Sequence, residues 1–319
     1  MRLPQPRLVA HADWSISPEK RWVCIAERAG DGGYHVAAPA PVGEPQALPR
    51  RLLADAGQQS VLLGVDFPLG LPMAYARAAG ITSFVDLLPK LGAGDWAAFF
   101  EPCEDAEDIS LGRPFYPRKP GGTAQAHLVE ALGVNSMDDL RRRCERRTDR
   151  RGAAAPLFWI LGAQQVGRAA ISGWRDLLQA SLADADVDLT LWPFEGSLAD
   201  MLKADRIVVA ETYPAECAVQ LGIGVTGRRW SKRRQSDRAT HAHALLDWAR
   251  NRRVSFDDSL QPLIRDGFGD LASGEDQFDS LIGLAGMLDV VFGARPEMPP
   301  MSNERRLVEG WILGQAFSD

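Results

Sequence analysis

VLLGVDFPLGLP, residues 61–72, begins as an unbroken apolar segment and then places Asp66 where another buried side chain is expected. A short apolar run that ends near a proline is typical of a strand covered on both faces, as in α/β proteins. An ionised carboxylate in such surroundings costs several kcal/mol unless it is paired, hydrogen-bonded or bound to a cation. Both the fold and the function therefore depend on the partner of Asp66.

Three shorter apolar segments precede this strand and alternate with turn residues. They are LVAHAD (8–13), RWVCIAERA (21–29) and YHVAAPA (34–40), and they predict an antiparallel meander. A helix predicted around 49–57 leads to the strand that carries Asp66, and this connection predicts that the strand runs parallel to one of the first three. The expected start of the fold is three strands, a helix and a strand.

The rest of the chain predicts an insertion, one more strand and a long helix. Residues 73–204 have a helical and irregular pattern, which we interpret as a large, mostly helical insertion within a single domain of residues 1–319. DRIVVAETYPAE, 205–216, predicts a buried strand that ends in Glu211 and a helix after it. An apolar helix is predicted over 274–291. The expected fold class is α/β with a mixed sheet.

Acidic residues recur at the ends of the predicted strands. VDFP (65–68) and ETYP (211–214) each contain an acid followed closely by proline, which cannot continue a central strand. These acids are therefore expected near the carboxyl ends of parallel strands, where open α/β sheets bind ligands. Asp13 ends the first predicted strand in the same way. Asp276 and Asp279 are three residues apart and share one face near the start of the last helix.

Together these acids predict a cation site. Asp13, Asp66, Glu211 and Asp279, with Asp276 as a further ligand, supply the carboxylate oxygens that Mg²⁺ and Mn²⁺ prefer. One or two such ions activate water and stabilise the leaving oxygen of a phosphodiester. We therefore expect metal-dependent hydrolysis, and a bound cation would explain a charged Asp66.

Each acid also has a structural interpretation. Asp13 precedes Trp14 and Ser15 and suits an Asx turn. A neighbouring basic residue is an alternative partner for Glu211. Asp276 suits the first turn of a helix, where its negative charge is favourable. The joint occurrence of these acids, and not any single one, favours the cation site.

A series of motifs resembles one known family. HADWS, VDFPLGLP, ETYPAE and EDQFDSLIGL, in this order and over most of the chain, are similar to the family called domain of unknown function 429, regarded as predicted nucleases of the ribonuclease H-like fold. The resemblance implies a mixed sheet, βββαβ followed by αβα, with the first strand central and the fourth and fifth beside it. It makes Asp13 the acid of the first strand, Asp66 of the fourth, Glu211 of the fifth and Asp279 of the closing helix, with Asp276 as a partner of Asp279.

Two basic stretches, 141–151 and 228–238, are candidates for holding a phosphate backbone. The second contains Lys232 and Arg233, which together with Arg118 are the candidate substrate-binding residues. The alternative for these residues is a solvated helix face or a surface turn. Nucleic acid is the partner that the functional interpretation predicts.

Composition limits the cellular compartments that suit the protein, but it does not identify a binding partner. The chain has 319 residues and a formal net charge of -6, so its overall charge does not attract nucleic acid or an anionic membrane. The four cysteines are too far apart in sequence for a zinc site or a disulfide framework. The first residues lack an apolar signal segment, and the most apolar run, 153–163, is shorter than the ~20 residues that span a bilayer. We expect a cytoplasmic protein without a membrane partner, and the sequence does not specify its oligomeric state.

Three other functions fit parts of the pattern. A non-enzymatic nucleic-acid-binding or scaffold protein would use the same acids as a polar network. An actin-like ATPase would have two βββαβ units and a glycine after the first-strand acid, whereas the sequence shows one unit and Asp13-Trp14-Ser15. Glycoside hydrolysis needs two carboxylates rather than four.

Overall fold

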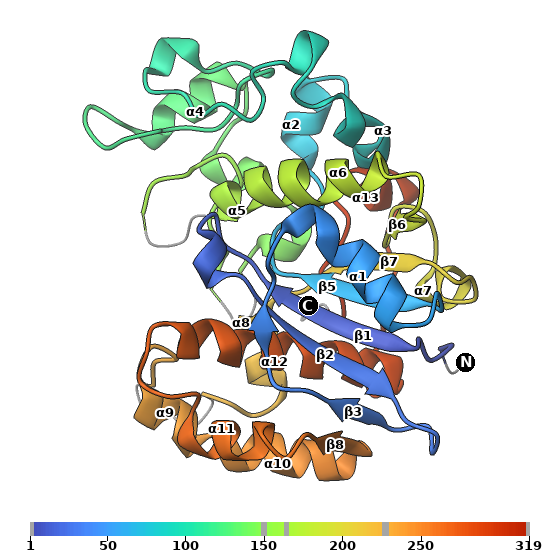
Figure 1. Ribbon diagram of the computed structural model, residues 1–319. Coiled ribbons are helices and arrows are strands. Elements are labelled where there is room, and N and C mark those ends of the chain that lie inside the picture. Colours follow the sequence, from blue (N-terminus) through green and yellow to red (C-terminus); the bar gives the residue numbers. More distant parts are fainter. Residues whose placement is uncertain (1–2, 148–151, 163–165, 225–229, 317–319) are drawn as a thin grey trace.

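The computed structural model describes residues 3–147, 152–162, 166–224 and 230–316, and within these ranges the strands form one eight-stranded sheet (Figure 1). The strand order is β6-β7-β5-β1-β2-β3-β8, and β4 pairs with β2. The strands are β1 (Leu8–Asp13), β2 (Trp22–Arg28), β3 (Tyr34–Val36), β4 (Ala40–Pro41), β5 (Val61–Val65), β6 (Leu189–Leu191), β7 (Ile207–Glu211) and β8 (Val254–Phe256). The sheet is mixed, because β1, β5, β7 and β6 run parallel whereas β1, β2 and β3 are antiparallel neighbours.

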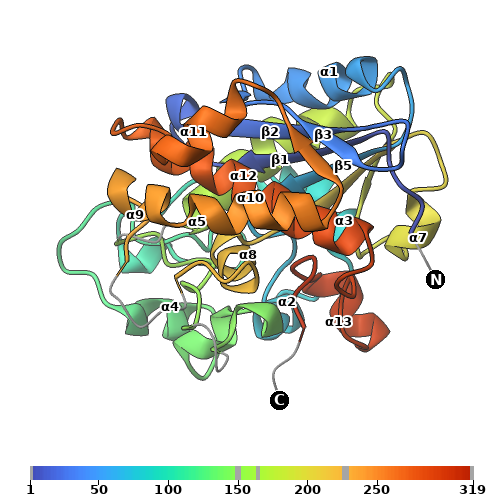
Figure 2. The ribbon, with the colours of Figure 1, turned by 90° about the horizontal axis from the view of Figure 1, so that it is seen from below.

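Helices cover both faces of this sheet, with α1 on one side and α12 and α10 on the other (Figure 2). They are α1 (Leu48–Asp55), α2 (Met73–Ala78), α3 (Phe84–Leu87), α4 (Gln125–Ala131), α5 (Val166–Ser172), α6 (Ala180–Leu182), α7 (Leu198–Met201), α8 (Pro214–Gln220), α9 (Gln235–Thr240), α10 (Ala242–Asn251), α11 (Leu260–Asp266), α12 (Ser273–Val291) and α13 (Asn303–Val308). A π-helical segment, Gly173–Gln179, joins α5 to α6. Short 3₁₀ helices are Pro18–Lys20, Pro45–Ala47, Leu88–Lys90, Gly94–Trp96, Ala106–Asp108, Met137–Leu140 and Arg143–Glu145. In the described part of the chain, no helix is both long enough and apolar enough to cross a membrane.

The start of the chain forms the meander, helix and parallel strand that its pattern predicts. β1 and β2 pair antiparallel, as do β2 and β3, and β5 returns after α1 to pair in parallel with β1. β7 then pairs in parallel with β5. In this register Ala12 lies beside Val65, and Val65 lies beside Glu211. The carboxyl ends of β1, β5 and β7 therefore meet at one edge of the sheet.

Alternate residues of the central strands belong to two different cores. Ala12 and Val65 point into the core on the side of α1 and of the insertion. Val9 and Leu62 point into the core on the side of α12. Helix α12 is buried along most of its length, which explains its apolar sequence and its lack of a polar face.

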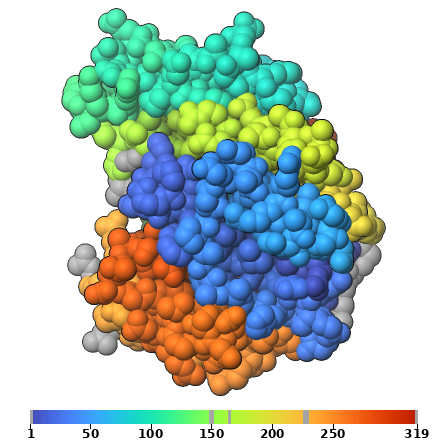
Figure 3. Space-filling view, viewed as in Figure 1, coloured from blue at the N-terminus to red at the C-terminus, as the bar shows by residue number. Residues whose placement is uncertain are grey.

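The segment of residues 73–204 lies between β5 and β7, and its teal and green surface covers one end of the molecule (Figure 3). Its sequence predicts a mostly helical insertion; it contains α2 to α7, but turns and irregular structure make up most of its described residues. It also contributes β6, which pairs in parallel with β7 in the main sheet. β6 is short and lies within the segment predicted to be mostly helical, so the sequence does not reveal it. The run predicted as one strand over 34–40 is divided between β3 and the first residue of β4, and β8 is a further short strand that the sequence does not predict.

Candidate functional site

Asp13 and Asp66 lie side by side at the carboxyl ends of β1 and β5. Each follows a residue of the Ala12–Val65 pair, so the two strands end at the same level. The backbone N–H of Trp14 donates to Asp66 Oδ1 over 2.6 Å, and the Asp13 and Asp66 carboxyl groups are close enough to influence each other electrostatically. Two neighbouring buried carboxyl groups favour a shared proton or a bound cation over two uncompensated negative charges.

Asp279 reaches these two acids from α12. It is buried, and its negative charge acts on both Asp13 and Asp66. Helix α12 packs closely against its neighbours because it has glycines at these contacts. A methyl group on Gly283 would overlap the ring of His11 on β1, and one on Gly286 would overlap Cys217 on α8.

Lys232 is the cation that this cluster already contains. Its ammonium donates a hydrogen bond to Asp279 Oδ2 and lies 3.5 Å from Glu275 Oε1. Burial would lower the pKa of Lys232, but the charge of Asp279 and the hydrogen bond to it raise the pKa above its usual range. Lys232 therefore stays protonated and offsets one carboxylate of the group.

Lys232, with the electrostatic effects of Arg238 on Asp279 and of Lys20 on Asp276, still leaves the cluster short of positive charge. Burial, reinforced by the charges of Asp66 and Asp279, raises the pKa of Asp13 well above its usual range. Burial also raises the pKa of Asp66 to about 7, against the opposing effect of its hydrogen bond from Trp14. Asp276, in the first turn of α12, has its pKa raised to about 6 by burial and by Glu275. Uncompensated negative charge of this kind attracts a proton or a cation.

Glu211 does not join the cluster, which corrects its expected convergence with the other acids. It is level with Val65, and residues at that level point to the α1 and insertion side of the sheet. There the guanidinium of Arg142 donates to both carboxylate oxygens over 2.6 Å. Burial raises the pKa of Glu211, while the Arg142 charge opposes that shift. The alternative considered for Glu211, a basic partner, is what the structure shows.

The Arg142–Glu211 pair fixes the loop that follows Asp66. Glu211 Oε2 accepts a hydrogen bond from the backbone N–H of Leu69 over 2.7 Å, and Arg142 donates to the Leu69 carbonyl over 2.6 Å. Arg142 also binds Glu145, so the arginine is itself held by two acids. Both polar backbone groups of Leu69 are thus satisfied by side chains from distant segments.

The helix that runs from α5 through the π-helical segment supports both acid-bearing strand ends. Trp14 donates its indole N–H to Ser172 Oγ over 2.9 Å, and Trp174 donates to the Pro68 carbonyl over 2.6 Å. A side chain at Gly173 would overlap the Phe67 ring, so the glycine permits this close approach. The insertion therefore positions the backbone just after Asp13 and just after Asp66.

His11 is a buried structural residue. Its ring contacts Thr212 Oγ1 at 2.7 Å and the Ser280 carbonyl at 3.1 Å. Burial lowers the pKa of His11 to about 3, against the effect of that carbonyl, so the ring is neutral at physiological pH. It joins β1 to β7 and α12 and does not supply a proton-transfer group to the cluster.

The candidate phosphate-binding residues have different surroundings. Arg233 is exposed and lies 3.9 Å from Glu275, next to the cluster. Arg118 is exposed within the insertion and pairs with Glu104 over 3.3 Å. In the first basic stretch, Arg142 is buried, which excludes a solvated face at that position, and residues 148–151 lie outside the described residues. Residues 228 and 229 of the second stretch also lie outside the described residues.

The cluster is not a preformed metal site. Among the described residues, no group of three or more histidine, cysteine, aspartate or glutamate side chains is arranged to hold a metal ion. At the cluster, Lys232 forms an ion pair with Asp279. The donor chemistry nevertheless suits a hard divalent cation, because the side chains offer carboxylate oxygens only.

Comparison with known proteins leaves this site to be interpreted from its own geometry. No family model, curated protein or solved structure matches the chain.

The sequence does not indicate the partners of two basic residues. Arg142 belongs to a basic stretch that is a candidate for contacting phosphate, although Glu145 three residues later is a signal for a local ion pair. Lys232, a candidate substrate-binding residue, forms an ion pair with Asp279. In both cases a contact distant in sequence determines the role of the residue.

Proposed function

We propose that the protein is a divalent-metal-dependent hydrolase that cleaves phosphodiester bonds in nucleic acid, that is, a nuclease. The observation that carries the proposal is the meeting of Asp13, Asp66 and Asp279 at the carboxyl-end edge of the sheet. These residues are distant in sequence, come from three elements and leave negative charge that one ammonium does not offset.

The proposed assignment gives each residue a defined task. Asp13, Asp66 and Asp279 would hold Mg²⁺ or Mn²⁺, with Asp276 close enough to influence Asp13 electrostatically. A bound divalent ion supplies an activated water and neutralises charge on the phosphate. Lys232 and Arg233 would bind phosphate oxygens, because both lie beside the acids and keep partly exposed side chains. Glu211 has no direct task in the chemistry, since Arg142 binds both of its oxygens.

The strand order supports the ribonuclease H-like part of the proposal. The consecutive strands β3, β2, β1, β5 and β7 place the first strand centrally with the Asp66 and Glu211 strands beside it, as the motif resemblance implies. The same resemblance expects acids on the first strand, the fourth strand and the closing helix. Fold alone is weak evidence for activity, so the acids carry more weight than the topology.

One observation favours a second candidate, a non-enzymatic nucleic-acid-binding or scaffold protein. Lys232 forms an ion pair with Asp279, so the cluster is partly neutralised without any metal. A polar network of this kind is consistent with a structural role. The two candidates differ in whether cation binding and bond cleavage depend on the same aspartates.

The deciding experiment incubates single-stranded, duplex, hybrid and junction nucleic acids with Mn²⁺ and compares the wild type with Asp13→Asn. The surface variant Asp55→Asn, on α1, is the matched control, because it makes the same chemical change outside the cluster. Cleavage by the wild type and by Asp55→Asn but not by Asp13→Asn is expected. Cleavage that survives Asp13→Asn would contradict the assignment, and binding without cleavage of any substrate would favour the scaffold candidate.

A further inference from the structure

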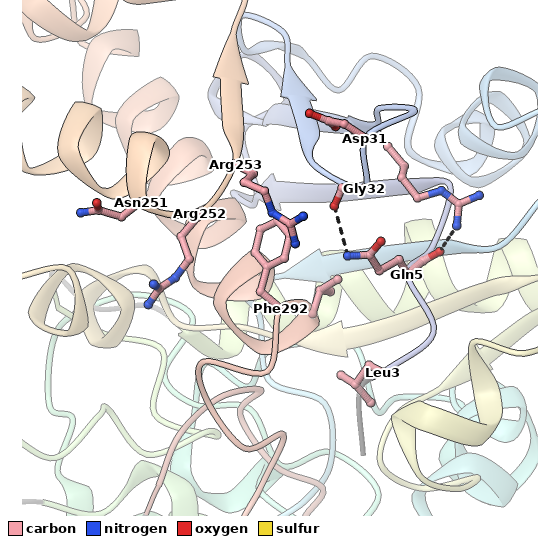
Figure 4. Close-up of a pocket in the computed structure, with 10 residues that line it drawn as sticks. Leu3, Gln5, Asp31, Gly32, Asn251, Arg252, Arg253 and Phe292 are labelled. Atoms are coloured by element: carbon pink, nitrogen blue, oxygen red, sulfur yellow. Dashed lines mark hydrogen bonds between the residues drawn. The ribbon is translucent and has the colours of Figure 1, made fainter.

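A pocket of about 580 Å³ lies at the end of the sheet opposite the acidic cluster (Figure 4). It is formed where β1 begins and α12 ends, whereas the acids lie at the other ends of these elements. Its walls come from the N-terminal segment, the β2–β3 turn, the end of α10 and the end of α12. This volume is within the range of ~300–1,000 Å³ that is usual for small-molecule sites.

Arginines dominate the charged lining of the pocket. Arg28, Arg252 and Arg253 face a single acid, Asp31. Arg252 donates to Asp289 over 2.8 Å, and Figure 4 shows its side chain directed away from the centre of the pocket. The remaining lining therefore has an excess of positive charge.

The other charged side chains of the lining differ in the hydrogen bonds that they form within the protein. Asp31 accepts a hydrogen bond from the Gly33 backbone over 2.9 Å, and Arg28 donates one N–H to the Gln5 carbonyl over 2.6 Å. Arg253 is exposed, and its guanidinium has no partner among the described residues. Figure 4 shows this side chain directed into the pocket toward Phe292. Arg253 thus presents a complete fork of N–H donors to a ligand.

The backbone of Arg253 is strained. Its φ of 55° is in the left-handed region, which favours glycine and costs other residues on the order of 1–3 kcal/mol. The surrounding structure holds it there, because its carbonyl accepts a hydrogen bond from the Tyr34 N–H over 3.1 Å. Glycine would be the favourable residue at this turn, so replacing Arg253 with glycine removes the guanidinium without adding backbone strain.

We propose that this pocket binds a small phosphate monoester, with Arg253 and Arg28 as the anion contacts. Arginine forks match phosphate oxygens, and two arginines from different walls offer more donors than a carboxylate would use. Phe292 and Val291 provide an apolar side for a planar or apolar group on the ester. The proposal concerns a second site and does not depend on the proposed nuclease function.

The test measures binding of inorganic phosphate, phenyl phosphate and benzoate to the full chain by calorimetry. Phenyl phosphate should bind most tightly, because only this probe combines the anion with a ring. Arg253→Gly should weaken phenyl phosphate binding about tenfold or more, as expected for losing a charge-assisted contact. The same variant should unfold at an equal or higher temperature, since glycine relieves the backbone strain.

Gln58→Gly is the matched control, because Gln58 also has a left-handed backbone, with φ of 60°, but does not line the pocket. It should share the thermal gain and keep wild-type binding. Absence of phenyl phosphate binding at millimolar concentration would overturn the proposal. So would equal binding by Arg253→Gly and the wild type, or tighter binding of benzoate than of phenyl phosphate.

Discussion

Arg142 binds both carboxylate oxygens of Glu211 over 2.6 Å, and neither side chain has appreciable contact with solvent. Arg142 comes from the insertion and Glu211 ends β7, so the ion pair joins the insertion to the central sheet. Ion pairs of this kind are weak evidence for stability as a whole, but breaking one by removing a single partner leaves a buried charge uncompensated.

Glu211→Gln should therefore destabilise the protein by roughly 3 kcal/mol, with Glu145 limiting the loss because it remains a partner of Arg142. Urea denaturation measures this change. Glu304→Gln makes the same substitution in an exposed pair with Arg77 and should leave stability unchanged. Equal effects of the two variants would show that the buried pair has no special contribution.

The stability of the metal-free protein should fall as pH rises toward neutrality. In the folded protein the pKa of Asp66 is raised from 3.8 to about 7. Between these two pH values the folded state therefore binds more protons than the unfolded state. The stabilisation that Asp66 contributes is fully present below its pKa in the unfolded state, and it is lost as the pH rises through about 7. Asp66→Asn should remove a pH dependence on the order of 3 kcal/mol between pH 4 and 8.

Thermal unfolding in the presence of a chelator, measured across this pH range, checks the prediction. Asp55→Asn is again the control and should keep the wild-type pH profile. A profile for Asp66→Asn that parallels the wild type would mean that Asp66 is ionised in the folded protein at all these pH values.

Mg²⁺ or Mn²⁺ should stabilise the wild type and not Asp66→Asn. Binding to the folded state alone adds about 2.7 kcal/mol when the ion is at 100 times its dissociation constant. Lys232→Met should bind the ion more tightly than the wild type, because the ammonium and the ion compete for Asp279. Ion titrations followed by thermal unfolding measure both effects. Weaker ion binding by Lys232→Met would exclude this competition.

Gly283→Ala should destabilise the protein even though alanine favours helix formation by about 1 kcal/mol. The added methyl group would overlap the His11 ring, which is fixed by Thr212 and Ser280 and cannot move aside freely. Gly30→Ala is the matched control, because a methyl group there meets open space. A stabilised Gly283→Ala would show that α12 can shift away from the sheet without loss.

The sequence predicted the elements whose apolar runs are long enough to show a period. The first strands, the Asp66 strand, the Glu211 strand and the closing helix all follow from such runs. Asp13, Asp66 and Asp279 could be assigned to one edge because strand ends and a helix start determine where they lie. Which face of the sheet a side chain occupies depends on its position in the strand and on the register between strands. The register between β5 and β7 places Glu211 on the face opposite to Asp13 and Asp66, and this register cannot be derived from one sequence. Arg142 could not be identified as its partner because the two residues are 69 positions apart in the sequence.

The anchoring of Leu69 has a consequence for how the molecule opens. Its amide proton is exposed to exchange only when the Glu211 carboxylate releases it, and that carboxylate is held by an arginine of the insertion. Partial unfolding of the insertion and loosening of the segment after Asp66 should therefore be one cooperative event, with similar protection from deuterium exchange in both regions. A protease that cuts the opened insertion would thereby also disable the acidic edge of the sheet.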